Sequence, residues 1–145
     1  MKPGVDYIGV SVGALIFNSK GELLLNKRSK KTRNQQGYWE APGGAVDFGE
    51  TRESAIKREI REELGIEIEI KGIIHTFDEI LQEENQHWLS TCYIAQIKGD
   101  KQPKIMEPEK SDGIGWFPLK NLPSPLSFIT TIDLDDYKRL KNTST

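Results

Sequence analysis

Short apolar runs separated by polar, turn-forming segments make up most of the chain, and this pattern is typical of β-strands joined by loops. Strands are predicted over residues 8–17, 22–27, 67–77, 88–97 and 115–117. Gly72 interrupts the alternation of apolar and polar residues in the third of these runs and is expected to be a β-bulge. The polar segments between the strands are expected to be loops, at residues 18–21, 32–37, 83–85, 99–103 and 107–113.

Two stretches have the spacing of helices instead. Between Thr51 and Gly65, the apolar residues recur on one helical face, at Ile56, Ile60 and Leu64. Thr51 suits the N-cap of this helix, and Gly65 suits the left-handed residue after its last turn. A second helix is predicted over residues 134–141, directly after Asp133. Helices and strands in this order predict a mixed β-sheet with helices packed on its faces, an α/β or α+β fold.

Acidic residues gather along the border of the apolar face of the first helix. Glu59, Glu62 and Glu63 have the spacing of helical neighbours, so their carboxylates form one patch. Like charges this close repel one another unless a cation lies between them. Magnesium is the natural candidate, because it takes oxygen ligands and keeps positions for water and substrate phosphates. For an isolated helix, the alternative is a solvated acidic face in which Arg58 and Glu62 form an ion pair.

The composition limits the class of protein. A chain of 145 residues has the size of one domain with its own core, so residues 1–145 are expected to form a single domain. The net charge of −2 predicts neither a stable nucleic-acid partner nor attraction to an anionic membrane. The single cysteine, Cys92, and the lack of a signal-peptide pattern favour the cytoplasm. A homodimer remains open.

Residues 44–66 fit, without a gap, the pattern G-x5-E-x7-R-E-U-x-E-E-x-G-U, in which U is a bulky aliphatic residue. This pattern is the signature of the Nudix hydrolases, and the chain resembles that family. The preceding residues 37–44, GYWEAPGG, resemble the lead-in of MutT-like enzymes. The resemblance implies an α/β/α sandwich with a mixed β-sheet. It also implies an enzyme that uses Mg²⁺, with Mn²⁺ as a substitute, to hydrolyse a phosphoanhydride bond in a nucleotide.

The resemblance also implies roles for individual residues. The divalent metal ligands would be Gly44, through its backbone carbonyl, and the carboxylates of Glu59, Glu62 and Glu63. Arg58 would join the loop to the helix through salt bridges and is included among the catalytic residues. A further glutamate commonly comes from a loop ahead of the last strand; Glu109 is the first candidate and Glu107 the second. Closely spaced carboxylates titrate together, so Glu62 and Glu63 are both candidates for the general base.

The substrate is predicted from what the downstream sequence contains and lacks. ADP-ribose enzymes of the family carry a proline, and diadenosine polyphosphate enzymes a tyrosine, at an offset that residues 81–83 (LQE) occupy here. The chain therefore looks most like the nucleoside triphosphate pyrophosphatases, which convert a (d)NTP to the (d)NMP and pyrophosphate. Substrate contacts are expected from a cation for the phosphates and aromatic rings for the base, at Arg28, Trp88, Trp116 and Phe117.

Other functions remain open. One is hydrolysis of another nucleoside diphosphate compound, such as ADP-ribose, a nucleotide sugar or a dinucleoside polyphosphate. Action on RNA 5′ ends would need a basic surface, and only the run at residues 27–33, which ends with Arg33, supports it. A nucleotide-binding module without catalysis would usually have a broken motif, whereas this motif is intact. His75 and His87 are expected to be structural strand residues.

Overall fold

The computed structural model describes residues 1–32 and 34–143, so Arg33 of the basic run lies outside the described residues. Within these ranges, seven strands form one mixed sheet and two α-helices lie against it. The elements in chain order are β1 (Gly9–Phe17), β2 (Leu23–Arg28), β3 (Trp39–Glu40), β4 (Gly43–Ala45), α1 (Arg52–Leu64), β5 (Glu67–Leu81), the short 3-10 helix η1 (Gln82–Glu84), β6 (Gln86–Lys98), β7 (Ser111–Phe117) and α2 (Phe128–Thr143).

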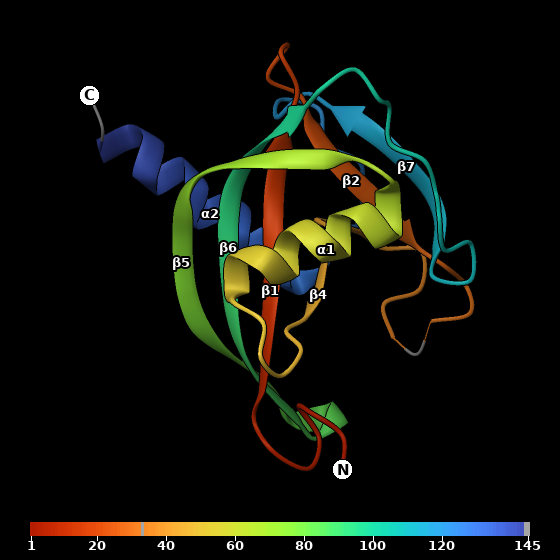
Figure 1. The fold of residues 1–145 in the computed structure, drawn as a ribbon, viewed down its shortest axis with the longest axis vertical. Coiled ribbons are helices and arrows are strands. Elements are labelled where there is room, and N and C mark those ends of the chain that lie inside the picture. The colour runs from red at the N-terminus through yellow and green to blue at the C-terminus, as the bar shows by residue number, and fades with distance from the viewer. Residues whose placement is uncertain (33, 144–145) are drawn as a thin grey trace.

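Strand β1 is central and organises the sheet (Figure 1). It runs parallel to β6, and β6 forms a long antiparallel hairpin with β5. On its other side, β1 pairs with β2 at Phe17 and Leu23, and the two strands then diverge. The short strands fill the edges that this divergence frees: β4 pairs with β1, and β3 pairs with β2. The segment between β3 and β4 therefore lies in a split of the sheet.

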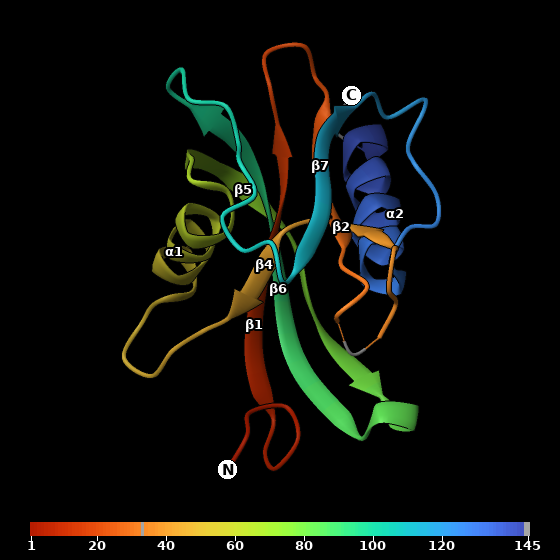
Figure 2. The ribbon, with the colours of Figure 1, turned by 90° about the vertical axis from the view of Figure 1, so that its right-hand side faces the viewer.

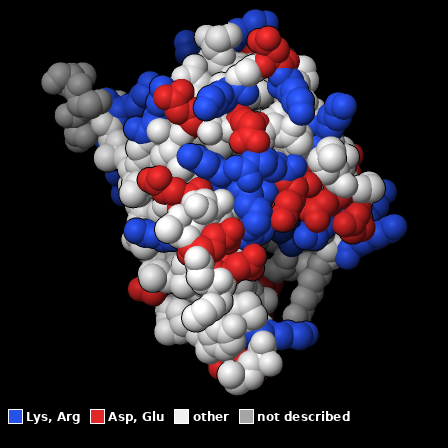
Figure 3. Space-filling view, viewed as in Figure 1, with Lys and Arg blue, Asp and Glu red and all other residues white. Residues whose placement is uncertain are grey.

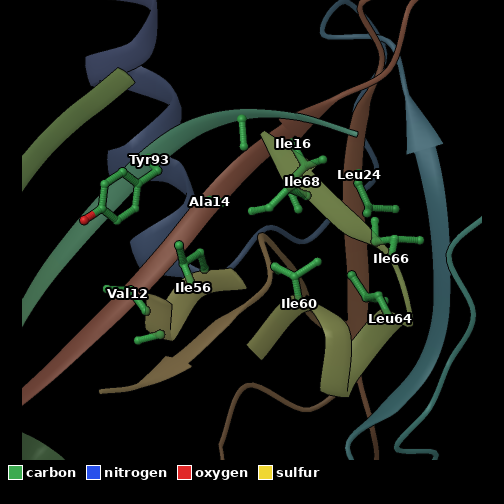
Figure 4. Close-up of a cluster of buried hydrophobic side chains, with 12 residues drawn as sticks. Val12, Ala14, Ile16, Leu24, Ile56, Ile60, Leu64, Ile66, Ile68 and Tyr93 are labelled. Carbon is green, nitrogen blue, oxygen red and sulfur yellow. The ribbon is translucent and has the colours of Figure 1, made fainter. Parts of the chain in front are cut away.

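The two helices cover opposite faces of the sheet, which gives three layers (Figure 2). Helix α1 buries Ile56, Ile60 and Leu64 against one face, as the sequence predicts, and Figure 4 shows them facing side chains of β1 and β5. Helix α2 buries Leu134 and Tyr137 against the other face, together with Leu15, Leu23, Leu25, Ile74 and Cys92. The predicted α/β/α sandwich with a mixed sheet is confirmed.

Helix α2 begins earlier than predicted, at Phe128 instead of residue 134. Ser127 caps it: the Ser127 Oγ accepts a hydrogen bond from the Thr130 N–H at 3.3 Å, and its carbonyl accepts one from the Thr131 N–H at 3.0 Å. The prediction was wrong because isoleucine and threonine fill residues 129–132, and these β-branched residues favour strands. Asp133 consequently lies inside the helix and is buried.

Strands β5 and β7 are also longer than predicted. Strand β5 continues to Leu81, because it pairs with β6 as far as Gln86. The predicted bulge at Gly72 is present, and a second irregularity lies between Ile73 and His75. Because of this second irregularity, two successive residues, Ile74 and His75, both contact α2. None of the helices in residues 1–32 and 34–143 is long and apolar enough to cross a membrane.

Candidate active site

The loop between β4 and α1 is joined to the helix by one arginine. Helix α1 starts after Thr51, whose Oγ accepts a hydrogen bond from the Ser54 N–H at 3.1 Å, and Gly65 ends it at a φ of 69°. From the helix, Arg58 donates to both carboxylate oxygens of Glu50, at 2.6 and 2.9 Å, and to the carbonyl of Ala45 at 3.0 Å. Bidentate pairs of this kind are geometrically specific, so the loop has a defined position over the helix.

Electrostatic effects agree with this arrangement. The hydrogen bonds from Arg58, followed by that from the backbone of Asp47, lower the pKa of Glu50 to about 2. The hydrogen bond to Glu50 raises the pKa of Arg58, with further contributions from Glu59. Arg58 also donates to Glu59 at 3.0 Å and to Glu62 at 3.2 Å. One cation thus holds the loop and two of the three motif carboxylates.

The two glycines before the loop are required by close approaches. A Cβ atom on Gly43 would lie 2.2 Å from the carbonyl oxygen of Val12 on β1. A Cβ atom on Gly44 would lie 2.3 Å from the carboxyl carbon of Glu59. The backbone of Gly44 therefore lies directly against a motif carboxylate.

Carboxylates crowd around Glu63, on the cavity side of α1. Burial, the adjacent Glu59 and the charges of Glu107 and Glu40 raise the pKa of Glu63 to about 9. Glu59 is also largely enclosed, with 15% of its side chain exposed, whereas 54% of the Glu62 side chain is exposed. The structure therefore directs Glu59 and Glu63 inward and leaves Glu62 at the rim.

A cavity of about 610 Å³ begins at these glutamates and extends to α2. This volume is within the usual range for small-molecule sites, about 300–1,000 Å³. Glu59, Glu63 and Glu107 line the end near α1. The remaining lining comes mainly from the split of the sheet, from β5 and β6, and from the start of α2, including Arg28, Glu40, Phe77, Cys92, Ile129 and Asp133.

The predicted substrate-binding residues are only partly in this cavity. Arg28 lines it, and its guanidinium already donates to Glu40 at 2.9 Å and to the Asn34 Oδ1 at 2.7 Å. Burial raises the pKa of Glu40, against the opposing charge of Arg28. Trp88 packs instead against Gly4 and Gly9 near the N-terminus, where any added Cβ would strike its ring.

The other two predicted aromatic residues also lie outside the cavity lining. Trp116 packs against the α1 core, and Phe117 packs against the α2 core with an edge contact to Trp39 at a centroid distance of 5.1 Å. Phe77 is the aromatic residue of the cavity lining. Sequence patterns missed Phe77, Glu40 and Asp133, because long-range strand pairing and the early start of α2 bring them there.

Of the two loop glutamates, the second candidate, Glu107, faces the cavity, and the first candidate, Glu109, does not. The side chain of Glu109 is exposed, and its backbone carbonyl accepts a hydrogen bond from the Ser29 Oγ at 2.7 Å. Glu107 lines the cavity and pairs with Lys110 at 3.4 Å. The cause is local docking: the Met106 N–H donates to the carbonyl of Glu63 at 3.0 Å, which satisfies the C-terminal end of α1. The residue after Met106 is thereby brought beside Glu63.

The donor set fits a hard divalent cation. Within residues 1–32 and 34–143, no group of three or more His, Cys, Asp or Glu side chains is close enough together to hold an ion. Arg58 engages Glu59 and Glu62, however, and Glu63 is crowded by like charges. A cation between Glu59, Glu63 and the backbone of Gly44 would offset that crowding with oxygen ligands. The predicted metal ligands Gly44, Glu59, Glu62 and Glu63 stay a prediction.

The layered fold places the arginine-held loop and the motif glutamates beside a cavity of about 610 Å³. The NUDIX domain matches residues 8–137, and the chain belongs to the Nudix family. It is 31% identical over 127 residues to an ADP-ribose pyrophosphatase from Methanocaldococcus jannaschii, covering 88% of this chain and 72% of that protein. It is 31% identical over 137 residues to the 8-oxo-dGDP phosphatase NUDT18 of Danio rerio, covering 94% of this chain but 39% of that protein.

A solved structure agrees with these relatives. The crystal structure of a MutT NUDIX hydrolase from Burkholderia pseudomallei is similar with a TM-score of 0.81 and 38% identity, over 90% of this chain and 98% of that one. The family, the fold and the enzyme class predicted from the sequence, a Nudix hydrolase acting on phosphoanhydride bonds, are thereby confirmed.

Proposed function

We propose that the protein is a Mg²⁺-dependent pyrophosphohydrolase that converts a (d)NTP to the (d)NMP and pyrophosphate. The observation that carries this proposal is the crowding of Glu63 beside Glu59 and Gly44, at the mouth of a cavity of about 610 Å³. Buried like charges are unfavourable unless a cation is bound, and phosphates require cations as well. A bound metal ion that neutralises a polyphosphate would therefore account both for the crowded carboxylates and for the cavity beside them.

The residues of the site would have distinct roles. Glu59, Glu63 and the carbonyl of Gly44 would hold the cation, with Glu62 at the rim. A bound divalent cation neutralises phosphate charge and lowers the pKa of the attacking water. Glu63 lines the cavity whereas 54% of the Glu62 side chain is exposed, so Glu63 is the better-placed general base of the two predicted candidates. Arg58 positions the loop, so it is a positioning residue in this proposal.

Glu107 replaces Glu109 as the proposed contribution from the loop before β7. Its side chain faces the same cavity and the same carboxylates as Glu63, and Lys110 beside it adds a positive charge. Burial lowers the pKa of Lys110, but the charge of Glu107 and its hydrogen bond raise it by more, so the net shift is upward. Lys110 would consequently stay charged and attract substrate phosphates.

Two alternatives have specific support. The M. jannaschii relative is named for ADP-ribose, and the D. rerio relative for 8-oxo-dGDP, so both compounds are second candidates as substrates. RNA 5′ ends have less support. Figure 3 shows that on the face carrying α1 the described Lys and Arg side chains are interspersed with Asp and Glu. The cytoplasmic location and a homodimer stay predictions from the sequence.

A substrate panel tests the proposal. Release of phosphate or pyrophosphate would be measured with ordinary and oxidised dNTPs, NTPs, ADP-ribose, nucleotide sugars and diadenosine polyphosphates, each with Mg²⁺ and with excess EDTA. We expect a (d)NTP to exceed the other compounds by at least about tenfold in kcat/KM and to release pyrophosphate, with activity lost in EDTA. Full activity in EDTA after metal removal would contradict the proposed metal dependence. Equal, very slow turnover of every compound would instead support the binding-module alternative.

A further inference from the structure

A histidine held between two aspartates joins β5 to α2, and one of these aspartates, Asp133, lines the cavity. The His75 Nε2 lies 2.7 Å from the Asp133 Oδ1, and its Nδ1 lies 2.6 Å from the Asp136 Oδ2. The hydrogen bond with Asp133 and that with Asp136 raise the pKa of His75, against the opposing effect of burial. This group, which we call the His75 clamp, joins β5 to α2 at Asp133 and Asp136.

The two aspartates differ in what else they face. Asp133 lines the cavity and keeps only 6% of its side chain exposed. Within the described part of the chain, Asp136 does not line the cavity, and 33% of its side chain is exposed to solvent. Asp133 can therefore contact a ligand in this cavity, whereas Asp136 faces solvent.

Asp133 has acceptor capacity left after its bond with His75. That bond uses Oδ1, and the thiol of Cys92, which also lowers the pKa of Asp133, donates to the carbonyl of Tyr93 at 3.8 Å. A thiol is a weak donor, and an ionised carboxylate has about four acceptor positions. Burial raises the pKa of Asp133, with His75 acting in the opposite direction. A ligand that donates a hydrogen bond here would add a second partner to the carboxylate that bonds His75.

The surroundings of Asp133 suit a flat heterocycle. Phe77 and Ile129 are the larger apolar residues of this part of the cavity lining, and Gly13, Ser90 and Cys92 are small. Phe77 is held by an edge contact with His75 at a centroid distance of 4.7 Å, so the same histidine positions both an aromatic ring and a carboxylate. Apolar lining with a few fixed polar groups is the usual composition of a small-molecule site.

We infer that Asp133, positioned by His75, is a specificity-determining residue that accepts a hydrogen bond from the exocyclic amino group of the substrate base. The inference rests on the proposed function, because it requires a nucleotide in this cavity. Guanine, adenine and cytosine carry such an amino group. Hypoxanthine and uracil place a hydrogen or a carbonyl oxygen where the amino group would be, and an oxygen there would face the carboxylate without a proton between them.

The test compares pairs of bases that differ at the amino group. Metal-free binding of GMP with IMP, AMP with IMP, and CMP with UMP would be measured by calorimetry, and kcat/KM for the matching triphosphates would be measured with Mg²⁺. We expect the wild type to favour the amino-bearing member of at least one pair by about tenfold or more. Asp133→Asn should reduce that preference to within about threefold. Its amide oxygen can keep the bond with His75, and its NH2 group, a donor, then takes the position of the Asp133 Oδ2.

Asp136→Asn is the matched control, because it removes the other clamp carboxylate without changing a cavity-lining residue. It should keep the wild-type preference even if it lowers the melting temperature. Each preference is a ratio within one preparation, so the fraction of folded protein does not change it. Equal loss of preference in both variants would overturn the inference in favour of a joint between β5 and α2. If Asp133→Asn does not fold, a wild-type ratio near one in all three pairs overturns it.

The two proposals fail in different ways. Absence of Mg²⁺-dependent hydrolysis with any triphosphate contradicts the proposed function, while the monophosphate binding ratios still decide the role of Asp133. Hydrolysis that proceeds equally well with both members of every pair contradicts the role of Asp133 alone.

Discussion

Replacing Glu63 by glutamine should remove catalysis and stabilise the metal-free protein at the same time. Glu63 lies among carboxylates, and its pKa is raised to about 9 by burial and by Glu59, Glu107 and Glu40. A carboxyl with a raised folded-state pKa keeps its full contribution to stability below the unfolded value, near 4.5, and loses it as the pH rises toward 9. The metal-free protein should therefore lose stability between about pH 5 and pH 9.

The magnitude follows from the same shift. Each pH unit above the unfolded pKa corresponds to about 1.4 kcal/mol, so keeping Glu63 protonated in the folded protein costs on the order of 3 kcal/mol at pH 7. In EDTA at pH 8 the same shift corresponds to about 4–5 kcal/mol, so Glu63→Gln should be more stable than the wild type by several kcal/mol, and near pH 5 the difference should fall below about 1 kcal/mol. With Mg²⁺, kcat should fall at least about a hundredfold, as is typical for loss of one acid–base or electrostatic group.

The assay is chemical unfolding in EDTA at pH 5, 6.5 and 8, repeated with Mg²⁺, alongside steady-state kinetics. Glu62→Gln is the matched control, since it removes the same charge from the same helix at a site where 54% of the side chain is exposed. It should change the stability of the metal-free protein by less than about 0.5 kcal/mol. The raised pKa of His75 also lowers stability as the pH rises, so the comparison uses the difference between variant and wild type. A variant that is no more stable than the wild type at pH 8 in EDTA would refute the reasoning.

Three further predictions follow from the geometry of the site. Glu107→Ala should lower kcat by about tenfold or more with a smaller effect on KM, whereas Glu109→Ala should be within about twofold of the wild type, because only Glu107 lines the cavity; the reverse order would restore the sequence-based choice. Gly44→Ala should lower activity at least about tenfold while circular dichroism stays unchanged, because its Cβ would displace the adjacent motif carboxylate; wild-type kinetics would contradict the close approach. Arg58→Gln should lower the free energy of unfolding by about 1–3 kcal/mol, because it leaves the loop carboxylates without their cation; an unchanged value in urea denaturation would show that the loop is held by other contacts.

The sequence was a sufficient guide where the deciding interactions are local. The start of α1 at Thr51, its end at Gly65 and its buried stripe depend on residues within a few positions of one another, and the structure has all three as predicted. The acidic patch follows from helical geometry in the same way. The intact motif then identified the family, because each of its positions serves one compact loop-and-helix unit.

Tertiary contacts decided the features that local pattern could not specify. Pairing with β6 extended β5, and the cap at Ser127 together with packing on the sheet made a helix of a β-branched segment. Docking of residues 104–106 on the end of α1 turned Glu107 rather than Glu109 toward the motif. The aromatic residues Trp88, Trp116 and Phe117 were directed elsewhere for a similar reason, since apolar rings are placed by whichever core they fill. The sequence by itself therefore determined the family, the layered fold and the chemistry of α1, while the lining of the cavity beyond that helix was decided by contacts between distant segments.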